Sequence, residues 1–244
     1  SKTNELGRHV VLHVMDQSKL GYQSPSEEMI QSLNALGNLS MQIIVDASQL
    51  RLDPKDIQNY LNKGYIITIT GSKYFTGPPY SGALILPKRV SKFINSVKTT
   101  LPKGLTTYYN HSDWPTSWFC SKNLSDGFNY GSNMRWNAAI VEMDRYYKTP
   151  VLYRNMGIEM FCNFVEDSIE DAPFLELLFG DKTKTNTYNS KEFGLRNICT
   201  IFPFFILKNE KVLSTDHVKK LYTLLNSDIS DKFLDSPIEI IRLA

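Results

Sequence analysis

Two apolar, β-branched segments of this sequence end in residues that can do covalent chemistry together. Residues 41–45 lead into Asp46 and then Gln49, and residues 65–70 lead into Lys73. We interpret each segment as a buried strand whose last residues project from one edge of a sheet, which is the edge where open α/β folds bind their ligands. A carboxylate, an amide and an amine delivered to one crevice can hold a pyridinium ring and form an imine with its aldehyde.

The elements that must position these residues follow the order strand, helix, strand, helix, strand, which is typical of parallel βαβ units. The expected strands cover residues 9–15, 41–45, 65–70 and 82–86. After the first strand, Ser24 is expected to cap a helix that has Pro25 in its first turn and Glu27 as the partner in a capping box. A second helix is expected to begin at Asp53 and to end at Gly64.

Beyond residue 87 longer helical patterns replace this alternation. Helices are expected over residues 91–99, 133–147, 151–169 and 216–225, strands over 198–207 and 238–243, and loops over 101–131 and 180–194. Met134, Ala138, Ile140, Val141 and Met143 supply the apolar positions of the 133–147 helix. Helices followed by a mixed strand layer predict a smaller α+β domain at residues 131–244, after an α/β domain at residues 1–130.

Composition and charge exclude several classes of protein. The 244 residues are 42% hydrophobic, enough for one sizeable core or two modest ones. The formal net charge is +2 with both signs interspersed, so we expect neither nucleic acid nor a membrane as partner. The three cysteines share no close spacing, which favours a reducing compartment, the cytoplasm, over a disulfide framework or a zinc site. No apolar stretch approaches the roughly 20 residues that span a bilayer.

Three short motifs together resemble the cofactor region of class V aminotransferases, which are pyridoxal-phosphate enzymes of fold type I. They are Asp46-Ala-Ser-Gln49, Thr70-Gly-Ser-Lys73 and the turn Gly77-Pro-Pro-Tyr-Ser-Gly82. The family has Asp-x-x-Gln or Asp-x-x-His, then Ser-x-His-Lys, then Gly-Pro-x-x-x-Gly, in this order and at comparable spacing. The resemblance covers residues 40–87, and the stretch from Asn133 resembles the start of the family's long interdomain helix.

The resemblance implies a mainly parallel sheet flanked by helices, pyridoxal 5'-phosphate as cofactor, and a role for each matching residue. Asp46 would keep the ring nitrogen protonated, so that the ring can accept electrons from a carbanion. Gln49 would hydrogen-bond the phenolic oxygen of the ring. Lys73 would form the Schiff base and then carry the proton, work that requires burial and nearby charge. Thr70 keeps the hydroxyl that the family serine offers to the phosphate, and Ser72 would orient the cofactor where cysteine desulfurases have histidine.

Four other residues are weaker candidates. His13 alternates with apolar neighbours, so a hydrogen-bonded core histidine is the favoured interpretation, although the family has a substrate-facing residue near this position. Cys120 is a loop thiol, but the desulfurases resembled here carry theirs later in the chain. Arg135 and Arg242 are candidates, by residue type alone, for binding a substrate carboxylate. No metal site is expected.

Two interpretations of function follow. The first is a transferase or lyase that acts on an amino acid through a Lys73 Schiff base, as a homodimer in the cytoplasm. Only 45 residues precede Asp46, and they contain neither the family's glycine-rich phosphate loop nor a ring-stacking aromatic, so we expect residues 1–130 to be the remaining part of a large domain. The second is a catalytically silent relative that keeps the sheet as a binding or structural module. A phosphate loop upstream in the parent sequence would favour the enzyme.

Overall fold

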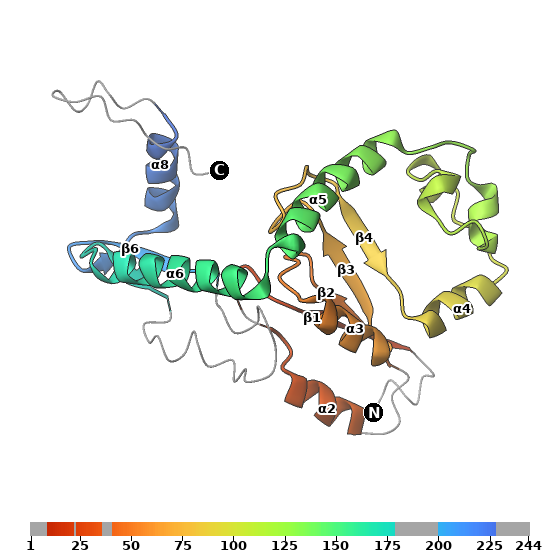
Figure 1. Cartoon of the computed structure of the whole chain (residues 1–244), viewed down its shortest axis with the longest axis horizontal. Coiled ribbons are helices and arrows are strands. Elements are labelled where there is room, and N and C mark those ends of the chain that lie inside the picture. Colours follow the sequence, from red (N-terminus) through yellow and green to blue (C-terminus); the bar gives the residue numbers. More distant parts are fainter. Residues whose placement is uncertain (1–8, 22, 36–40, 179–199, 228–244) are drawn as a thin grey trace.

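A four-stranded mixed sheet forms the centre of the first half of the chain (Figure 1). The computed structural model describes residues 9–21, 23–35, 41–178 and 200–227. The strands lie side by side in the order β1 (Val10–Met15), β2 (Met41–Asp46), β3 (Ile66–Thr70) and β4 (Gly82–Ile85). The first three are parallel and β4 runs antiparallel to β3. The predicted α/β class is confirmed, and β4 reverses because the connection before it is too short for a crossover to a parallel strand.

The core of this half lies on one face of the sheet. Val14, Val45 and Ile67 come from three neighbouring strands and are fully buried, each with 0% of its surface exposed. Ile30 and Tyr60 belong to the same buried cluster; they come from the helices α2 (Glu27–Ala35) and α3 (Pro54–Asn62). Each large apolar side chain buried in this way contributes about 1.5–3 kcal/mol. The core therefore fixes the register that places the strand ends beside one another.

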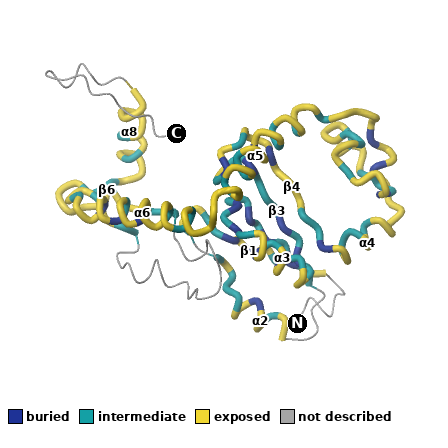
Figure 2. The backbone as a smooth tube through the Cα atoms, in the orientation of Figure 1, coloured by how far each residue is buried: buried dark blue, intermediate teal, exposed yellow. Residues whose placement is uncertain are grey.

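The opposite face of β1 is open to solvent. Val11, His13 and Met15 alternate with the buried residues of the strand and are exposed, Val11 at 52% and Met15 at 40%. In Figure 2, β2 and β3 carry only buried and intermediate residues, whereas most of the two long helices that follow them, α5 and α6, is exposed. The expected core position of His13 is wrong, because the alternation of the strand places this residue on the solvent side.

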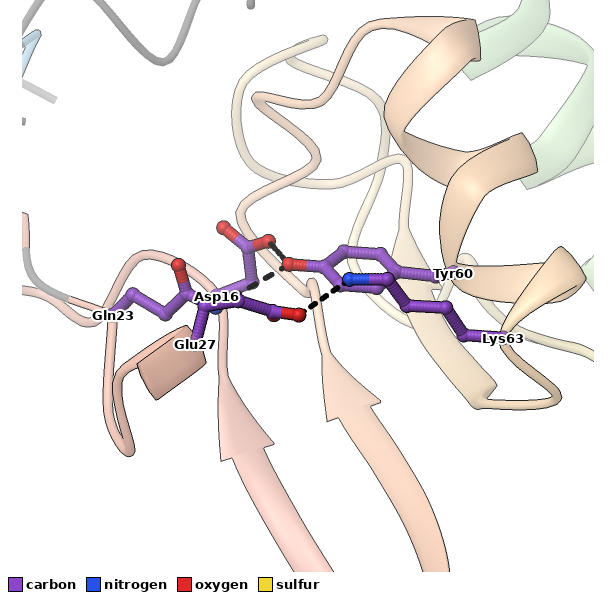
Figure 3. A network of polar contacts seen from close by, with 5 residues as sticks. All are labelled: Asp16, Gln23, Glu27, Tyr60 and Lys63. Carbon is purple, nitrogen blue, oxygen red and sulfur yellow. Dashed lines mark hydrogen bonds and ion pairs between the residues drawn. The ribbon is translucent and has the colours of Figure 1, made fainter. Parts of the chain in front are cut away.

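The predicted limits of α3 are confirmed. The backbone N–H of Asp53 donates to the carboxylate of Asp56 at 3.2 Å, which satisfies a free donor at the start of the helix. Gly64 follows the helix with a φ of +82°, a conformation that favours glycine. An exposed ion pair of 2.5 Å between Lys63 and Glu27 joins the end of α3 to the start of α2 (Figure 3).

The start of α2 differs from the prediction. The helix begins at Glu27, and the hydroxyl of Ser26 accepts the N–H of Met29 at 3.3 Å. Ser24 is not the cap, because its backbone pairs with Met15 at the end of β1 through hydrogen bonds of 2.8 and 3.1 Å. The pairing with β1 takes precedence over the local capping signal, and the helix starts two residues later.

Two long helices, α5 (Tyr130–Lys148) and α6 (Val151–Glu170), connect this sheet to a second one (Figure 1). The intervening and following elements are α4 (Lys88–Ser96), three short 3-10 helices (Leu105–Thr107, His111–Asp113, Phe119–Asn123), β5 (Leu175–Leu177), β6 (Phe204–Lys208), β7 (Lys211–Val212) and α8 (Thr215–Leu225). The strand predicted over 198–207 begins only at Phe204. The predicted loop at 180–194 and strand at 238–243 lie outside the described residues, and the division into two domains near residue 130 stays a prediction.

Helix α6 carries both buried and exposed apolar residues. Cys162 and Ile169 are buried, at 6% and 5% exposure, on the side that packs toward β5. Leu152, Phe161 and Phe164 are exposed at 65%, 57% and 70%. A water-exposed helix is ordinarily polar on its outer side, but these three residues are spread around the helix, and the Phe161 ring contacts the Phe202 ring with 6.4 Å between their centroids.

Candidate active site

Asp46 ends β2 and keeps an ionised carboxylate at the edge of the sheet. Its Oδ1 accepts the N–H of Ser48 at 3.0 Å and hydrogen bonds from the hydroxyls of Ser48 and, at 3.4 Å, Thr68. Partial burial raises the pKa of Asp46. The hydrogen bonds from Ser48, the positive charge of Lys73 and the Thr68 hydroxyl together lower the pKa by more than burial raises it, so it lies below its ordinary value. A carboxylate of this kind can bind a protonated ring nitrogen at neutral pH.

Lys73 lies in the turn that follows β3, and its side chain is exposed. Thr76 donates its N–H to the carbonyl of Lys73 at 2.9 Å, and Phe75, with 3% exposure, anchors the turn in the interior. The expected burial of Lys73 is therefore wrong, because Phe75 rather than Lys73 is the residue that the turn directs inward. Asp46 ends β2 and the turn with Lys73 follows the neighbouring parallel strand β3, so the backbone brings these two predicted residues to the same edge.

The side-chain hydroxyls of Thr70 and Ser72 form a hydrogen-bonded pair at the same edge of the sheet. Their side-chain oxygens lie 2.6 Å apart, and the Thr70 hydroxyl also accepts the N–H of Ser72 at 2.9 Å. Both residues are half-buried. Two adjacent hydroxyls at the end of a strand can donate together to an anionic group such as a phosphate.

Gln49 also lies at this edge, but its amide has a partner that the sequence analysis did not consider. The Nη1 of Arg51 donates to the Oε1 of Gln49 at 2.8 Å. The Nε of Arg51 donates to the hydroxyl of Thr200 at 2.7 Å, and its guanidinium lies 5.3 Å from the centre of the Tyr74 ring. An arginine two residues after Gln49 in the same turn was the only signal in the sequence.

The turn that contains Lys73 packs closely against α5 because the residues at the contact are small. A Cβ on Gly71 would lie 2.4 Å from the Cβ of Ala139, and a Cβ on Gly77 would lie 2.7 Å from the same atom and from the carbonyl oxygen of Gly71. The indole N–H of Trp136 donates to the carbonyl of Gly82 at 3.2 Å. Gly71 of the second motif and Gly77 of the third thus allow a close approach of the helix to the turn, which fixes where Lys73 emerges.

Asp16 is a buried carboxylate at this same edge that the sequence analysis missed (Figure 3). It is 4% exposed and follows β1 directly, and its backbone N–H donates to the carbonyl of Asp46 at 2.9 Å. The hydroxyl of Tyr60 donates to its Oδ2 at 2.5 Å, and the amide of Gln23 donates to the same hydroxyl at 3.5 Å. This network connects α3 to the strand ends, and the backbone hydrogen bond joins Asp16 to Asp46.

The weaker candidates lie elsewhere. Arg135 is on α5, with its guanidinium 5.9 Å from the centre of the Tyr80 ring. Cys120 is a half-buried free thiol in the Phe119–Asn123 helix. Arg242 lies outside the described residues. Within the described ranges, no three His, Cys, Asp or Glu side chains are grouped so as to hold a metal ion.

An open pocket of about 420 Å³ lies between α5 and the turn after Lys73. Its walls are Tyr74, Phe75, Thr76, Glu142, Arg145, Tyr146 and Thr149. Burial and the neighbouring Tyr146 raise the pKa of Tyr74 above its usual range, while Arg145 and Glu142 form an exposed ion pair of 2.8 Å. Asp46, Gln49 and Thr70 do not line this pocket, so it adjoins the predicted site without being formed by it.

Comparisons with known proteins give no relative from which a function could be transferred. No protein-family model matches the chain, and neither curated proteins nor solved structures give a match. Among the described helices, none combines the length and the apolar character needed to cross a bilayer.

Proposed function

We propose that this chain is part of a pyridoxal-phosphate-dependent transferase or lyase of fold type I that acts on an amino acid. The observation that carries the proposal is the placement of Asp46 at the end of β2 and of Lys73 in the turn after β3, the parallel strand beside it. A pyridoxal ring requires an anion at its nitrogen and an amine at its aldehyde. These two side chains supply both groups.

The remaining polar residues fit the other groups of this cofactor. The hydroxyls of Thr70 and Ser72 would hold the phosphate, and the amide of Gln49 would donate to the phenolic oxygen of the ring. Asp46 would keep the ring nitrogen protonated, and Lys73 would bind the aldehyde and move a proton at its amine. When bound, the cofactor supplies an electron sink for a carbanion next to the amino group of the substrate.

Addition of pyridoxal phosphate to the full-length protein tests this function. The unmodified protein and the Lys63→Ala variant are expected to develop the visible absorbance band of a lysine-bound cofactor, whereas Lys73→Ala is expected to lose it. Lys63 is a suitable control because it is another exposed lysine of the same half of the chain, paired only with a surface carboxylate. Equal absorbance in both variants would mean that Lys73 does not bind the cofactor.

The proposal includes a homodimer in the cytoplasm. The exposed apolar residues of α6, among them Leu152 and Phe164, support self-association, because burial of such side chains is the main driving force for protein contact. The cytoplasm is proposed because the three cysteines share no close spacing that would suggest a disulfide framework. Light scattering during gel filtration is expected to give the mass of two chains, and Phe164→Glu is expected to shift it toward one.

One observation favours the second candidate, a catalytically silent relative that serves as a binding or structural module. Lys73 is exposed, whereas a catalytic lysine works best in a desolvated site. For this candidate, no cofactor binding is expected at any concentration near physiological levels. The absorbance experiment on the full-length protein distinguishes the two functions.

A further inference from the structure

Arg51 contacts both segments of the proposed cofactor site. It donates to the amide oxygen of Gln49 at 2.8 Å, and its guanidinium lies 5.3 Å from the centre of the Tyr74 ring, the residue next to Lys73. Its Nε donates to Thr200, from the second half of the chain, at 2.7 Å. One planar group thus connects the turn after β2, the turn after β3 and a distant segment.

The contact with Gln49 determines which way the amide faces. An arginine has five donors and no acceptor, so only the carbonyl oxygen of the amide can face it. The NH2 group of Gln49, which lies in the same plane as the oxygen, then points away from the guanidinium. An amide held in this way presents a donor, and a donor is the group that stabilises an ionised phenolic oxygen.

We propose that Arg51 is a positioning residue that fixes the Gln49 amide as a hydrogen-bond donor toward the phenolic oxygen of the cofactor ring. This inference rests on the proposed function. Arginine suits the task better than lysine because its planar fork can donate to Gln49 and Thr200 at once while stacking on Tyr74. Without this guanidinium the amide is free to rotate, and the ionised ring oxygen loses its directed donor.

The test is the pH titration of the visible absorbance of the protein loaded with pyridoxal phosphate. Arg51→Met is expected to raise the midpoint by about one pH unit, a tenfold change in proton affinity, because a charge-assisted hydrogen bond to the ionised oxygen is lost. Gln49→Leu is expected to raise it by a similar amount. Arg51→Met introduced into the Gln49→Leu variant is expected to cause no further shift, and Arg51→Lys in the native background is expected to recover part of the native midpoint.

Arg154→Met is the matched control. It also removes an arginine stacked on tyrosine rings, 4.6 Å from the Tyr146 centroid, while Gln49 keeps its donor from Arg51. Its midpoint is expected to equal that of the unmodified protein.

Three results would overturn the inference. The first is an unchanged midpoint in Arg51→Met. The second is an equal shift from Arg51→Met with and without Gln49, which would indicate a general effect of charge. In both cases the cofactor would still be bound at Lys73, so the proposed function would survive. The third is the absence of a Lys73-bound cofactor in the unmodified protein, which would remove the proposed function and the positioning role together.

Discussion

An alanine at Gly71 tests how the turn that carries Lys73 is held against α5. The added Cβ would lie 2.4 Å from the Cβ of Ala139, whereas carbon atoms in contact ordinarily lie about 3.5–4.0 Å apart. Gly71 does not have a positive φ, so the cost is steric and not conformational. Overpacking of a close contact costs about 1–3 kcal/mol, and an overlap of this size places the expected loss of unfolding free energy near the upper end, about 3 kcal/mol.

A second substitution separates the contact with the helix from other effects. Ala139→Gly removes the atom that clashes, at a cost of about 1 kcal/mol for a glycine within a helix. The next nearest atom to the new Cβ is the Ser81 hydroxyl oxygen at 3.2 Å, a contact that requires only a small adjustment. The double variant Gly71→Ala with Ala139→Gly is therefore expected to be about 1 kcal/mol less stable than the unmodified protein, and not about 4 kcal/mol as additivity would give.

Gly77 provides the discriminating comparison. A Cβ there would lie 2.7 Å from the Cβ of Ala139 but also 2.7 Å from the carbonyl oxygen of Gly71, which is backbone. Ala139→Gly removes only one of these overlaps, so the double variant with Gly77→Ala is expected to stay destabilised by about 3 kcal/mol or more. Gly104 is the control, because a Cβ there meets nothing within 4 Å; its alanine variant is expected to change stability by less than about 0.5 kcal/mol.

Urea unfolding measures all of these variants. The midpoints should shift while the slopes stay constant, which indicates a change in stability alone. Equal recovery of Gly71→Ala and Gly77→Ala by Ala139→Gly would refute the reasoning, as would a Gly71→Ala variant as stable as the unmodified protein.

Three further predictions concern titratable groups. Tyr60→Phe removes a hydrogen bond to the buried carboxylate of Asp16 and is expected to lower the free energy of unfolding by about 1.5–3 kcal/mol in urea; a loss below about 0.5 kcal/mol would contradict this role. The pKa of Asp46 is lowered from 3.8 in the folded protein, so its ionised carboxylate stabilises the fold above pH 3.8, and this stability is lost as the pH falls through the lowered pKa. Asp46→Asn should therefore be less stable than the unmodified protein at pH 7. In acid unfolding curves the difference between the two proteins should disappear. Burial raises the pKa of Tyr147 to about 12, and it also raises the pKa of Tyr74. The neutral phenols therefore stabilise the fold fully below about pH 10, and this stabilisation should fall as the pH rises through the raised pKa values. An ultraviolet titration in which either phenol ionises at its ordinary pKa would show that prediction to be wrong.

The strands and most helices followed from local patterns. β-branched runs predicted β1, β2 and β3, because residues of this kind fit a buried sheet, and the Asp53 and Gly64 signals predicted both ends of α3. Elsewhere the local pattern gave the wrong prediction, because contacts between distant residues determine the structure there. The backbone of Ser24 pairs with β1, which a capping motif cannot reveal, and the strands β5 and β7 are too short to show a period.

The candidate site was predictable in its backbone placement and not in its side-chain environment. Parallel strands bring Asp46 and Lys73 to one edge whatever surrounds them. Whether Lys73 is buried depends on what covers the turn, and that is a tertiary property. The Arg51–Thr200 and Tyr60–Asp16 contacts join residues far apart in the sequence, so spacing alone gave no sign of them. In α5, Ala139 is the buried residue while Met134 and Ile140 are exposed, because close approach to the turn requires a small side chain there and not a large apolar one.

The most direct measurement of the central claim is to treat the full-length protein with pyridoxal phosphate, reduce it with borohydride and locate the label by mass spectrometry of peptides. The cofactor is expected on the peptide that contains Lys73, and the Asp46→Asn variant is expected to be labelled less at equal cofactor concentration. A label spread over other lysines, or none at all, would contradict the assignment of this sheet edge as a pyridoxal-phosphate site.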